Sequence, residues 1–587
     1  MDIFKILSLI GGLALFLYGM DLMGDSLKKL AGGKLESILA RLTSTKWKGF
    51  LLGLIVTAII QSSSATTVML VGFVNSGIMK LGQTLSIIMG ANIGTTVTSW
   101  LLSTADIQGT AILIKLFKPE SFTPILAGIG LIMTMTAKND TKRNTGNMLL
   151  GFAILMFGMN AMSGAVKDLR NNEAFTNILT MFGDNPIMGI LVGTIFTAII
   201  QSSSASVGVL QALALSVAIP YSTAIPVILG QNIGTTITPI ISSVSGNTES
   251  KRVAITCLYI KMIGVIVVCG IFYLLHSVIG FSFMTREAGA IDIAFIHTLF
   301  NILSTVILIP FTSWIEKLAV KTIKGKGEEE KEIDVFATLD DRFLAMPAFA
   351  VEKCKDLVCE MATISEEAYN KAVGLLTNFD LATYEEVDKL ETRADKYEDK
   401  TSTYLIKIAA NNMSADDSKQ VTELLHSIGD IERISDHAMN IAKAAKEIYD
   451  KKITFSEKAK RDLAVISKAV SEILELTTKA LINDDIELAK HVEPLEQVVD
   501  SLNKKTKNGH ITRLRQGDCT MELGFILSDL LTNYARVADH CSNIAVCIIE
   551  ISKDSFKTHE YLNQLKYGGE SEFSALFDSY QQKYSLE

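Results

Sequence analysis

Two short polar stretches lie deep within apolar sequence, and their residue types suit ion binding. TAIIQSSSATT occupies residues 57–67, and TAIIQSSSASV occupies residues 197–207. Each stretch combines one carboxamide with a run of hydroxyls. At the end of an interrupted helix, such groups suit an anion at the helix N-terminus or a hard cation such as sodium. The alternative is that the hydroxyls only pack helices closely and cap their ends. The repetition of the whole cluster favours binding.

The candidate ligands fall in two matching sets. The first stretch offers Gln61, Ser62, Ser63, Ser64, Thr66 and Thr67, and the second offers Gln201, Ser202, Ser203, Ser204 and Ser206. A further motif, NIGTT, follows each stretch and adds Asn92, Thr95 and Thr96 in one case and Asn232, Thr235 and Thr236 in the other. The glycines of these motifs, Gly94 and Gly234, permit a break in a helix at each site.

These matches belong to one internal duplication. The segment LFLYGM at 15–20 is echoed by ILMFGM at 154–159, an offset of 139 residues, and the QSSS and NIGTT motifs repeat at an offset of 140. Loop charge indicates that the copies are inverted. The loop at 21–48 holds six Lys or Arg residues, whereas its counterpart at 160–186 holds two. Because Lys and Arg favour cytoplasmic loops, equivalent loops lie on opposite sides of a membrane. Inverted repeats are a common transporter plan with a binding site at the midplane.

Apolar runs and charge divide the chain into a membrane part and a soluble part. Predicted spans are 4–20, 84–103, 110–136, 147–166, 222–244, 253–275 and 293–315, and each QSSS segment forms a re-entrant hairpin whose irregular backbone lines a binding cavity. We predict an all-α polytopic membrane protein with inverted repeats, followed by a soluble tandem of three-helix bundles. The expected divisions are repeat 1 at 1–140, repeat 2 at 141–316, a charged linker at 317–339, the bundles at 340–555 and a tail at 556–587. The bilayer is the expected partner, and the loop charges place the soluble part in the cytoplasm.

The soluble part contains its own repeat and several spaced carboxylates. RISDHAMNIAKA at 433–444 matches RVADHCSNIAVC at 536–547. Carboxylates four residues apart share one helix face, and such pairs are Glu391 with Asp395, Glu432 with Asp436, and Glu496 with Asp500. Pairs that converge from neighbouring helices hold metal ions in helix bundles. In the second repeat Ala535 takes the place of Glu432, so Asp539 lacks a partner. A solvated acidic face is the alternative.

The membrane part resembles the type II sodium–phosphate cotransporters, on the strength of both QSSS segments, both NIGTT segments and HTLFN at 297–301. The stretch GDIERISDHAMNIA at 429–442 resembles the signature of PhoU proteins, which are helical phosphate-signalling regulators. The resemblance implies sodium coordination by Gln201, Ser202, Thr235 and Thr238. It implies phosphate binding by Gln61, Ser62, Ser63 and Ser64, and we extend this set to Thr66, Asn92, Thr95, Ser203, Ser204 and Asn232. It also implies iron or zinc in the PhoU-like part, while His297 is expected to be structural.

The prediction is a sodium-coupled secondary transporter of inorganic phosphate with a regulatory PhoU-like domain. A membrane-anchored phosphate sensor and a phosphate exporter stay open as alternative functions. A homodimer is a possible assembly. An enzyme is not expected, because no intramembrane cluster of His, Asp or Glu offers a nucleophile, a base or a catalytic metal site. The net charge of −8 gives no reason to expect nucleic acid. The repeat cores contain no Arg, so we expect a neutral site that holds phosphate weakly enough to release it.

Overall fold

The computed structural model describes residues 3–31, 45–106, 119–325, 335–411, 413–516, 519–552 and 571–586. Within these ranges the chain is helical, and its one β-type contact is an isolated bridge between Pro220 and Glu287. The chain divides into two compact units, Met1–Phe349 and Ala350–Glu587. The predicted all-α fold with an apolar first unit is therefore confirmed.

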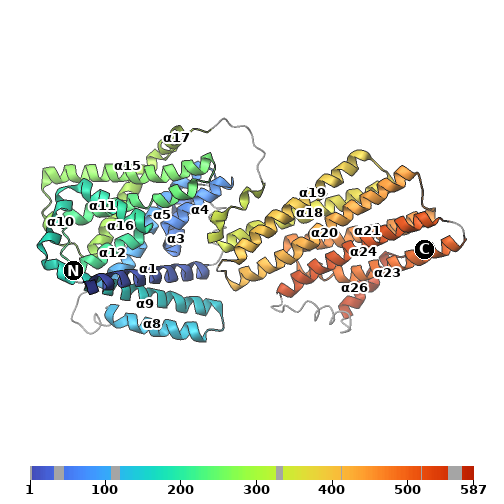
Figure 1. Ribbon diagram of the computed structural model, residues 1–587, viewed down its shortest axis with the longest axis horizontal. Helices are drawn as coiled ribbons and strands as arrows, with labels where there is room; N and C mark the ends of the chain where they lie inside the picture. Colours follow the sequence, from blue (N-terminus) through green and yellow to red (C-terminus); the bar gives the residue numbers. More distant parts are fainter. Residues whose placement is uncertain are drawn as a thin grey trace. The chain divides into compact units, whose positions relative to one another are not determined.

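Within the described residues the first unit consists of helices (Figure 1). Its α-helices are α1 (Ile3–Ala31), α3 (Lys46–Ile60), α4 (Ser63–Asn75), α5 (Leu81–Gly94), α6 (Thr96–Ser103), α8 (Pro119–Thr136), α9 (Asp140–Val166), α10 (Glu173–Asp184), α11 (Pro186–Ile200), α12 (Ser203–Ala214), α13 (Tyr221–Gly234), α14 (Ile237–Ser243), α15 (Thr248–Ile279), α16 (Ala290–Leu308) and α17 (Thr312–Thr322). Short 3₁₀ turns are η1 (Thr104–Asp106), η2 (Lys167–Asn171), η3 (Ser282–Thr285), η4 (Ile309–Phe311), η5 (Val335–Thr338) and η6 (Asp341–Ala345).

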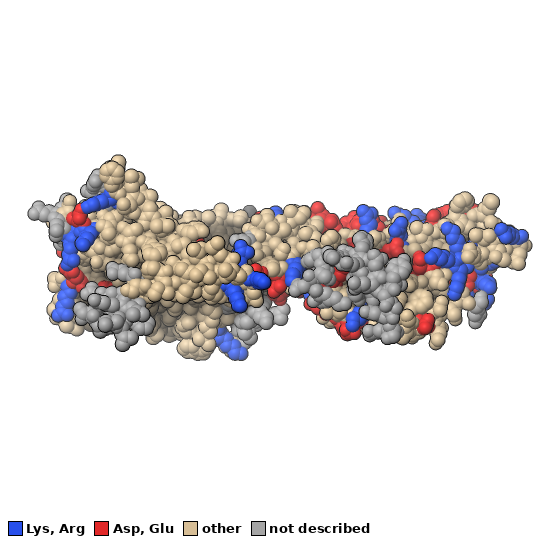
Figure 2. All heavy atoms as spheres, turned by 90° about the horizontal axis from the view of Figure 1, so that it is seen from below, with Lys and Arg blue, Asp and Glu red and all other residues tan. Residues whose placement is uncertain are grey.

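Six helical segments of this unit are long and apolar enough to cross a membrane. They are Ile3–Ala31, Leu81–Asp106, Asp140–Arg170, Tyr221–Ser243, Thr248–Ile279 and Ala290–Thr322. The predicted span 110–136 begins outside the described residues and continues as α8. Charged side chains of this unit gather toward its ends in Figure 2 and leave an uncharged band between them. Large apolar side chains such as Met135, Ile199 and Val278 are at least three-quarters exposed, as contact with lipid requires.

Equivalent helices of the two repeats, α1 and α9, cross each other in antiparallel directions. Gly12 lies against Gly158, and Gly19 lies against Gly151, so closely that a Cβ atom at Gly19 would meet backbone atoms at 2.3 Å. The offset of 139 residues converts Gly12 into Gly151 and Gly19 into Gly158. The two contacts are therefore one contact seen from each helix, as a two-fold axis between inverted repeats demands.

A second glycine pattern shows that each repeat folds in the same way. In the first repeat, Cβ atoms at Gly53 and Gly90 would lie 2.1 and 1.9 Å from carbonyl oxygens of the facing helix in the α3–α5 pair. In the second repeat, Gly193 and Gly230 have the same relation in the α11–α13 pair, at 2.2 and 2.0 Å. Small residues thus let each hairpin's first helix pack directly against the helix that ends in NIGTT.

The last residues of the first unit clamp the ends of three helices. Asp340 accepts from Asn75 of α4 at 2.7 Å and pairs with Arg342, which donates to the Ser242 carbonyl of α14 at 3.3 Å. Asn75 also accepts from the backbone of Asn247 at 2.8 Å. Phe343 is fully buried. Residues 340–343 therefore tie α4 of the first repeat to α14 of the second, and Asn75 adds a direct contact to the start of α15.

This clamp predicts where the first unit can be truncated. A chain that ends at Phe349 keeps the clamp, whereas a chain that ends at Lys326 loses it. Removing a buried Phe costs about 3–5 kcal/mol, so we expect the shorter chain to melt roughly 5–15 °C lower in detergent. Phe343→Ala in the full chain should reproduce most of this loss. Equal melting temperatures for the two truncated chains would show that the clamp does not stabilise the unit.

The second unit contains two sets of long helices, in agreement with the predicted tandem bundles. Its helices are α18 (Pro347–Thr377), α19 (Leu381–Ala409), α20 (Ala415–Lys451), α21 (Glu457–Asn483), α22 (Ile486–Ala489), α23 (Val492–Gln516), α24 (Met521–Ser552) and α26 (Ser571–Lys583). The sets meet in a common core, where the fully buried rings of Tyr369 and Tyr534 lie edge to face with centroids 6.3 Å apart. Charged side chains are scattered over the surface of this unit (Figure 2).

Candidate functional site

Each QSSS segment is the turn of a helical hairpin. Helix α3 ends at Ile60, Gln61 turns the chain, and the Ser62 side chain caps α4 by accepting from the Ala65 backbone N–H at 3.1 Å. In the second copy, Ser202 caps α12 by accepting from the Ala205 N–H at 3.2 Å. We call residues 61–64 the first tip and residues 201–204 the second tip. The depth of the hairpins in a membrane stays a prediction.

Both glutamines hold a backbone conformation that non-glycine residues seldom adopt. Gln61 has φ 59° and Gln201 has φ 62°, and they are two of the four non-glycine residues with positive φ in the described part of the chain. Each turn is braced by a hydroxyl pair that joins the hairpin's two helices. Thr57 and Thr66 approach to 3.0 Å, and Thr197 donates to Ser206 at 2.7 Å. Sparsely populated backbone held by such bracing is typical of functional sites.

The two tips meet. The Ser64 hydroxyl of the first tip donates to the Gln201 carbonyl of the second at 3.3 Å. The side chains of Ser63, Ser203 and Ser204 make no hydrogen bond to another described residue, so their hydroxyls are available to a ligand. Thr66 differs, because its buried hydroxyl is taken up by Thr57 and by the Ser62 carbonyl. Among the predicted phosphate ligands, Ser63, Ser203 and Ser204 have free hydroxyls, Ser62 caps a helix, Ser64 joins the two tips, and Thr66 braces the turn.

The NIGTT motifs interrupt their helices as the glycines predicted, between α5 and α6 and between α13 and α14. The two copies differ in their hydrogen bonds. Thr98 donates to the Gln61 side chain at 2.6 Å, but its counterpart Thr238 has a buried hydroxyl without a partner among the described residues. The Thr95 hydroxyl is also buried and unpartnered, while Thr235 donates to the Asn232 carbonyl at 2.6 Å. Asn92 is buried beside this break.

A buried cation that was not among the predicted site residues lies beside the second NIGTT motif. Lys261 lies within α15 and is 6% exposed, and its Nζ atom donates to Asn232 Oδ1 at 3.2 Å. The expectation of a neutral site rested on the absence of Arg, and it did not consider this lysine beside the second NIGTT motif. A single lysine in the middle of an apolar 32-residue helix was the available signal. His297 is fully buried and pairs with the Ser99 hydroxyl at 3.0 Å, which gives it a helix-joining contact.

Three of the predicted metal ligands converge in the second unit. Oxygens of Glu391, Asp395 and Asp436 all lie within 4.8 Å of one another. Burial and the neighbouring carboxylates raise the pKa of Glu391, and burial and Asp436 raise the pKa of Asp395. Glu432 stands nearby, since burial and Asp436 raise its pKa as well. Three carboxylates that repel one another fit a divalent cation with oxygen ligands.

The second set of carboxylates does not form such a group among the described residues. Asp500 pairs with Lys504 at 3.1 Å, and Asp539 pairs with Arg536 at 3.3 Å. Burial raises the pKa of Asp539, and the charge of Asp500 adds to the effect, so these two carboxylates lie near each other. Glu496 makes contacts of its own. The loss of a carboxylate at Ala535 is consistent with one complete acidic cluster and one incomplete one.

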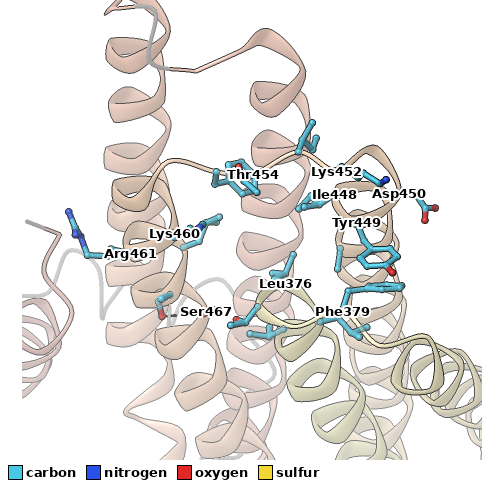
Figure 3. A pocket seen from close by; sticks show the side chains of 18 of the residues that line it. Leu376, Phe379, Ile448, Tyr449, Asp450, Lys452, Thr454, Lys460, Arg461 and Ser467 are labelled. Carbon is cyan, nitrogen blue, oxygen red and sulfur yellow. Dashed lines mark hydrogen bonds between the residues drawn. The ribbon is translucent and has the colours of Figure 1, made fainter.

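A cavity of about 1010 Å³ lies elsewhere in the second unit, among the ends of α18 and α20 and the start of α21 (Figure 3). Phe379 and Tyr449 stack at its side with ring centroids 4.6 Å apart. Lys460 points toward the interior in Figure 3, but Arg461 points away from it. The cavity shares no residue with the acidic cluster, and its mixed lining selects no single class of ligand.

Comparison with known proteins decides the family of each unit. A model of the Na+/Pi-cotransporter family matches residues 15–164 and 154–286, and a model of the PhoU domain matches residues 358–445 and 463–548. The first unit belongs to the Na+/Pi-cotransporter family, and the second is a PhoU domain. The protein is accordingly a multi-span membrane protein of a phosphate-transport family with a soluble C-terminal PhoU domain. No enzyme family is among these matches.

Individual relatives have the same architecture or part of it. "Putative inorganic phosphate export protein YjbB" of Escherichia coli is 22% identical over 95% of this chain and 99% of its own. YqeW of Bacillus subtilis is 29% identical over 53% of this chain and 96% of its own. "Sodium-dependent phosphate transport protein 2A" of Rattus norvegicus is 34% identical over 17% of this chain and 16% of its own. The solved PhoU of Pseudomonas aeruginosa is 21% identical over 35% of this chain and 97% of its own, with a TM-score of 0.33.

Proposed function

We propose that the protein carries inorganic phosphate across the cell membrane together with sodium, and that its PhoU domain regulates this transport from the cytoplasm. The contact between Ser64 and Gln201 is the observation that supports this most, because it brings the N-termini of α4 and α12 to one place. Helix N-termini carry partial positive charge and free backbone N–H groups, which suit an anion.

The two tips divide the ligands in this proposal. The free hydroxyls of Ser63, Ser203 and Ser204 and the N–H groups behind them bind phosphate, with Gln61, Ser62 and Ser64 completing the first tip. The amides of Asn92 and Asn232 and the Thr95 hydroxyl lie at the helix breaks. Sodium binds Gln201, Ser202, Thr235 and Thr238, where the unpartnered Thr238 hydroxyl supports an oxygen-coordinated ion.

Uptake into proteoliposomes tests the sodium coupling. Purified protein is reconstituted, and labelled phosphate is supplied outside with an inward sodium gradient or with a matched potassium gradient. We expect accumulation above equilibrium with sodium, and collapse of that accumulation after a sodium ionophore is added. Equal uptake in sodium and potassium would overturn the coupling and leave phosphate transport alone.

Export is a second candidate, favoured by the name of the full-length E. coli relative. A coupled carrier moves phosphate in the direction that the combined gradients set. Vesicles preloaded with labelled phosphate and sodium test this direction. Release that accelerates with internal sodium supports export by the same carrier, and release that ignores sodium supports a different driving force. Homodimer formation stays a prediction, and light scattering on purified protein measures it.

We propose further that the acidic cluster of the PhoU domain binds iron or zinc. The three carboxylates of Glu391, Asp395 and Asp436 fit a divalent ion with oxygen ligands. A metal there would neutralise charges that otherwise repel. If the cluster is instead a solvated acidic face, added metal should stabilise the parent no more than a variant with one carboxylate neutralised.

Asp436→Asn separates these alternatives. The pKa values of Glu391 and Asp395 are raised in the folded protein, so their ionised forms cost stability, and this cost grows as pH rises through the raised values. In EDTA at neutral pH we expect Asp436→Asn to raise the melting temperature of the PhoU domain by roughly 1–4 °C. Added ferrous or zinc ion should stabilise the parent but not the variant.

Elemental analysis of the purified chain completes this test, and Asp399→Asn on α19, the helix that carries Glu391 and Asp395, is the control. A parent chain that holds no iron or zinc, and that neither metal stabilises, would leave the solvated-face interpretation standing.

A further inference from the structure

Lys261 is a buried cation without an anionic partner. Its side chain is 6% exposed, and its Nζ atom makes one hydrogen bond, to Asn232 Oδ1. Within the described residues no Asp or Glu forms an ion pair with it, and the titratable groups in electrostatic range are Cys257 and His297. His297 adds no negative charge, and its Nε2 atom is itself buried without a partner.

An uncompensated ammonium in such a place is costly. Even after relaxation, removing an ion from water costs several kcal/mol, and ionisable residues inside membrane helices accordingly mark substrate or ion pathways. A buried lysine at this position lowers the stability of the unit unless an anion pairs with it during the transport cycle. Asn232, which orients the ammonium, belongs to the second NIGTT motif.

We propose that Lys261 is the fixed counter-charge for phosphate, and that its ammonium donates to a phosphate oxygen while Asn232 holds Nζ in position. This role rests on the proposed phosphate transport and adds a residue to that site. Hydroxyls and helix ends supply only partial charges to an anion of one to two negative charges, whereas Lys261 supplies a full charge in a dehydrated surrounding, where charge-assisted hydrogen bonds are strong. Lys261 therefore distinguishes anions from neutral solutes of similar size.

The test uses the full chain and three variants. Lys261→Met keeps most of the side-chain volume and removes the charge, Lys261→Arg keeps the charge, and Lys251→Met removes a lysine from the same helix outside the core. Phosphate uptake at saturating sodium should show a KM at least about 30-fold higher in Lys261→Met, equivalent to losing one charged hydrogen bond of ~2 kcal/mol. Lys261→Arg should recover part of this loss, and Lys251→Met should match the parent.

A second measurement does not depend on transport. Inorganic phosphate should raise the melting temperature of the detergent-solubilised parent, and this rise should disappear in Lys261→Met. Without phosphate, Lys261→Met should melt at or above the parent temperature, because a buried charge has been removed. A folded Lys261→Met variant with the parental KM and the parental phosphate-induced shift would overturn the role of Lys261. A parent that neither transports phosphate nor is stabilised by it would overturn the proposed function itself.

Discussion

Gly90→Ala and Gly230→Ala should each abolish the folded membrane unit. A Cβ atom at Gly90 would lie 1.9 Å from the Phe50 carbonyl oxygen, and one at Gly230 would lie 2.0 Å from the Ile190 carbonyl oxygen. These neighbours are helix backbone, so no rotamer change relieves the overlap. Overpacking of a core costs about 1–3 kcal/mol where side chains can move, and here whole helices must separate. The expected cost therefore lies above that range.

The measurement is the yield of monodisperse protein after detergent extraction, together with its melting temperature. Gly128→Ala and Gly270→Ala are matched controls, because a Cβ atom at either position meets nothing within 4 Å. Both lie inside helices, where Ala is favoured over Gly by about 0.5–1 kcal/mol, so these variants should be as stable as the parent or slightly more so. Parental yield and melting temperature for Gly90→Ala would mean that α3 and α5 do not pack this closely.

Ser62→Ala and Ser202→Ala should weaken the binding of different ligands, although each removes an equivalent helix cap. Each serine caps its helix through an equivalent hydrogen bond, at 3.1 and 3.2 Å, so each variant loses about 1 kcal/mol of helix capping. Under the proposed division of ligands, Ser62→Ala mainly raises the KM for phosphate, and Ser202→Ala mainly raises the half-saturating sodium concentration. A lost ligand hydrogen bond of about 1–3 kcal/mol gives roughly a 5- to 150-fold effect.

Uptake is measured against sodium and phosphate for the two variants at matched expression. Ser63→Ala should resemble Ser62→Ala, and Gln201→Ala should resemble Ser202→Ala. Because sodium and phosphate binding are coupled, each variant should also lower the affinity for the other ligand, to a lesser degree. Ser26→Ala is the control, since its hydroxyl only donates to the Leu22 carbonyl within α1. If the tip variants transport like the parent, the tip hydroxyls serve only to shape the hairpins.

Much of this site could be predicted because its signals are local and occur twice. A polar run before a new apolar helix predicts serine caps, and Gly94 and Gly234 predict helix breaks. The spacing of Glu391 and Asp395 predicts one helix face. The arrival of Asp436 beside them depends on how α19 packs against α20, so spacing within one helix could only suggest it.

The remaining features depend on contacts between distant residues. The sequence shows Lys261 only as an isolated charge in an apolar stretch of helix, and its hydrogen bond to Asn232 is visible only in the structure. Nothing local distinguishes Thr66, which braces a turn, from Ser63, which is free. Thr98 and Thr238 occupy equivalent positions in the repeat, yet only Thr98 reaches a glutamine. Such differences arise from the surroundings of each copy and not from its own residues.

The antiparallel crossing of α1 and α9 has a consequence for how the chain can switch. The two halves are the same motif in opposite orientations. If they exchanged their local conformations, a site open to one side of the membrane would become the two-fold-related site open to the other side. The two halves do differ in local arrangement, because Thr98 donates to the Gln61 side chain while the equivalent Thr238 hydroxyl has no partner among the described residues.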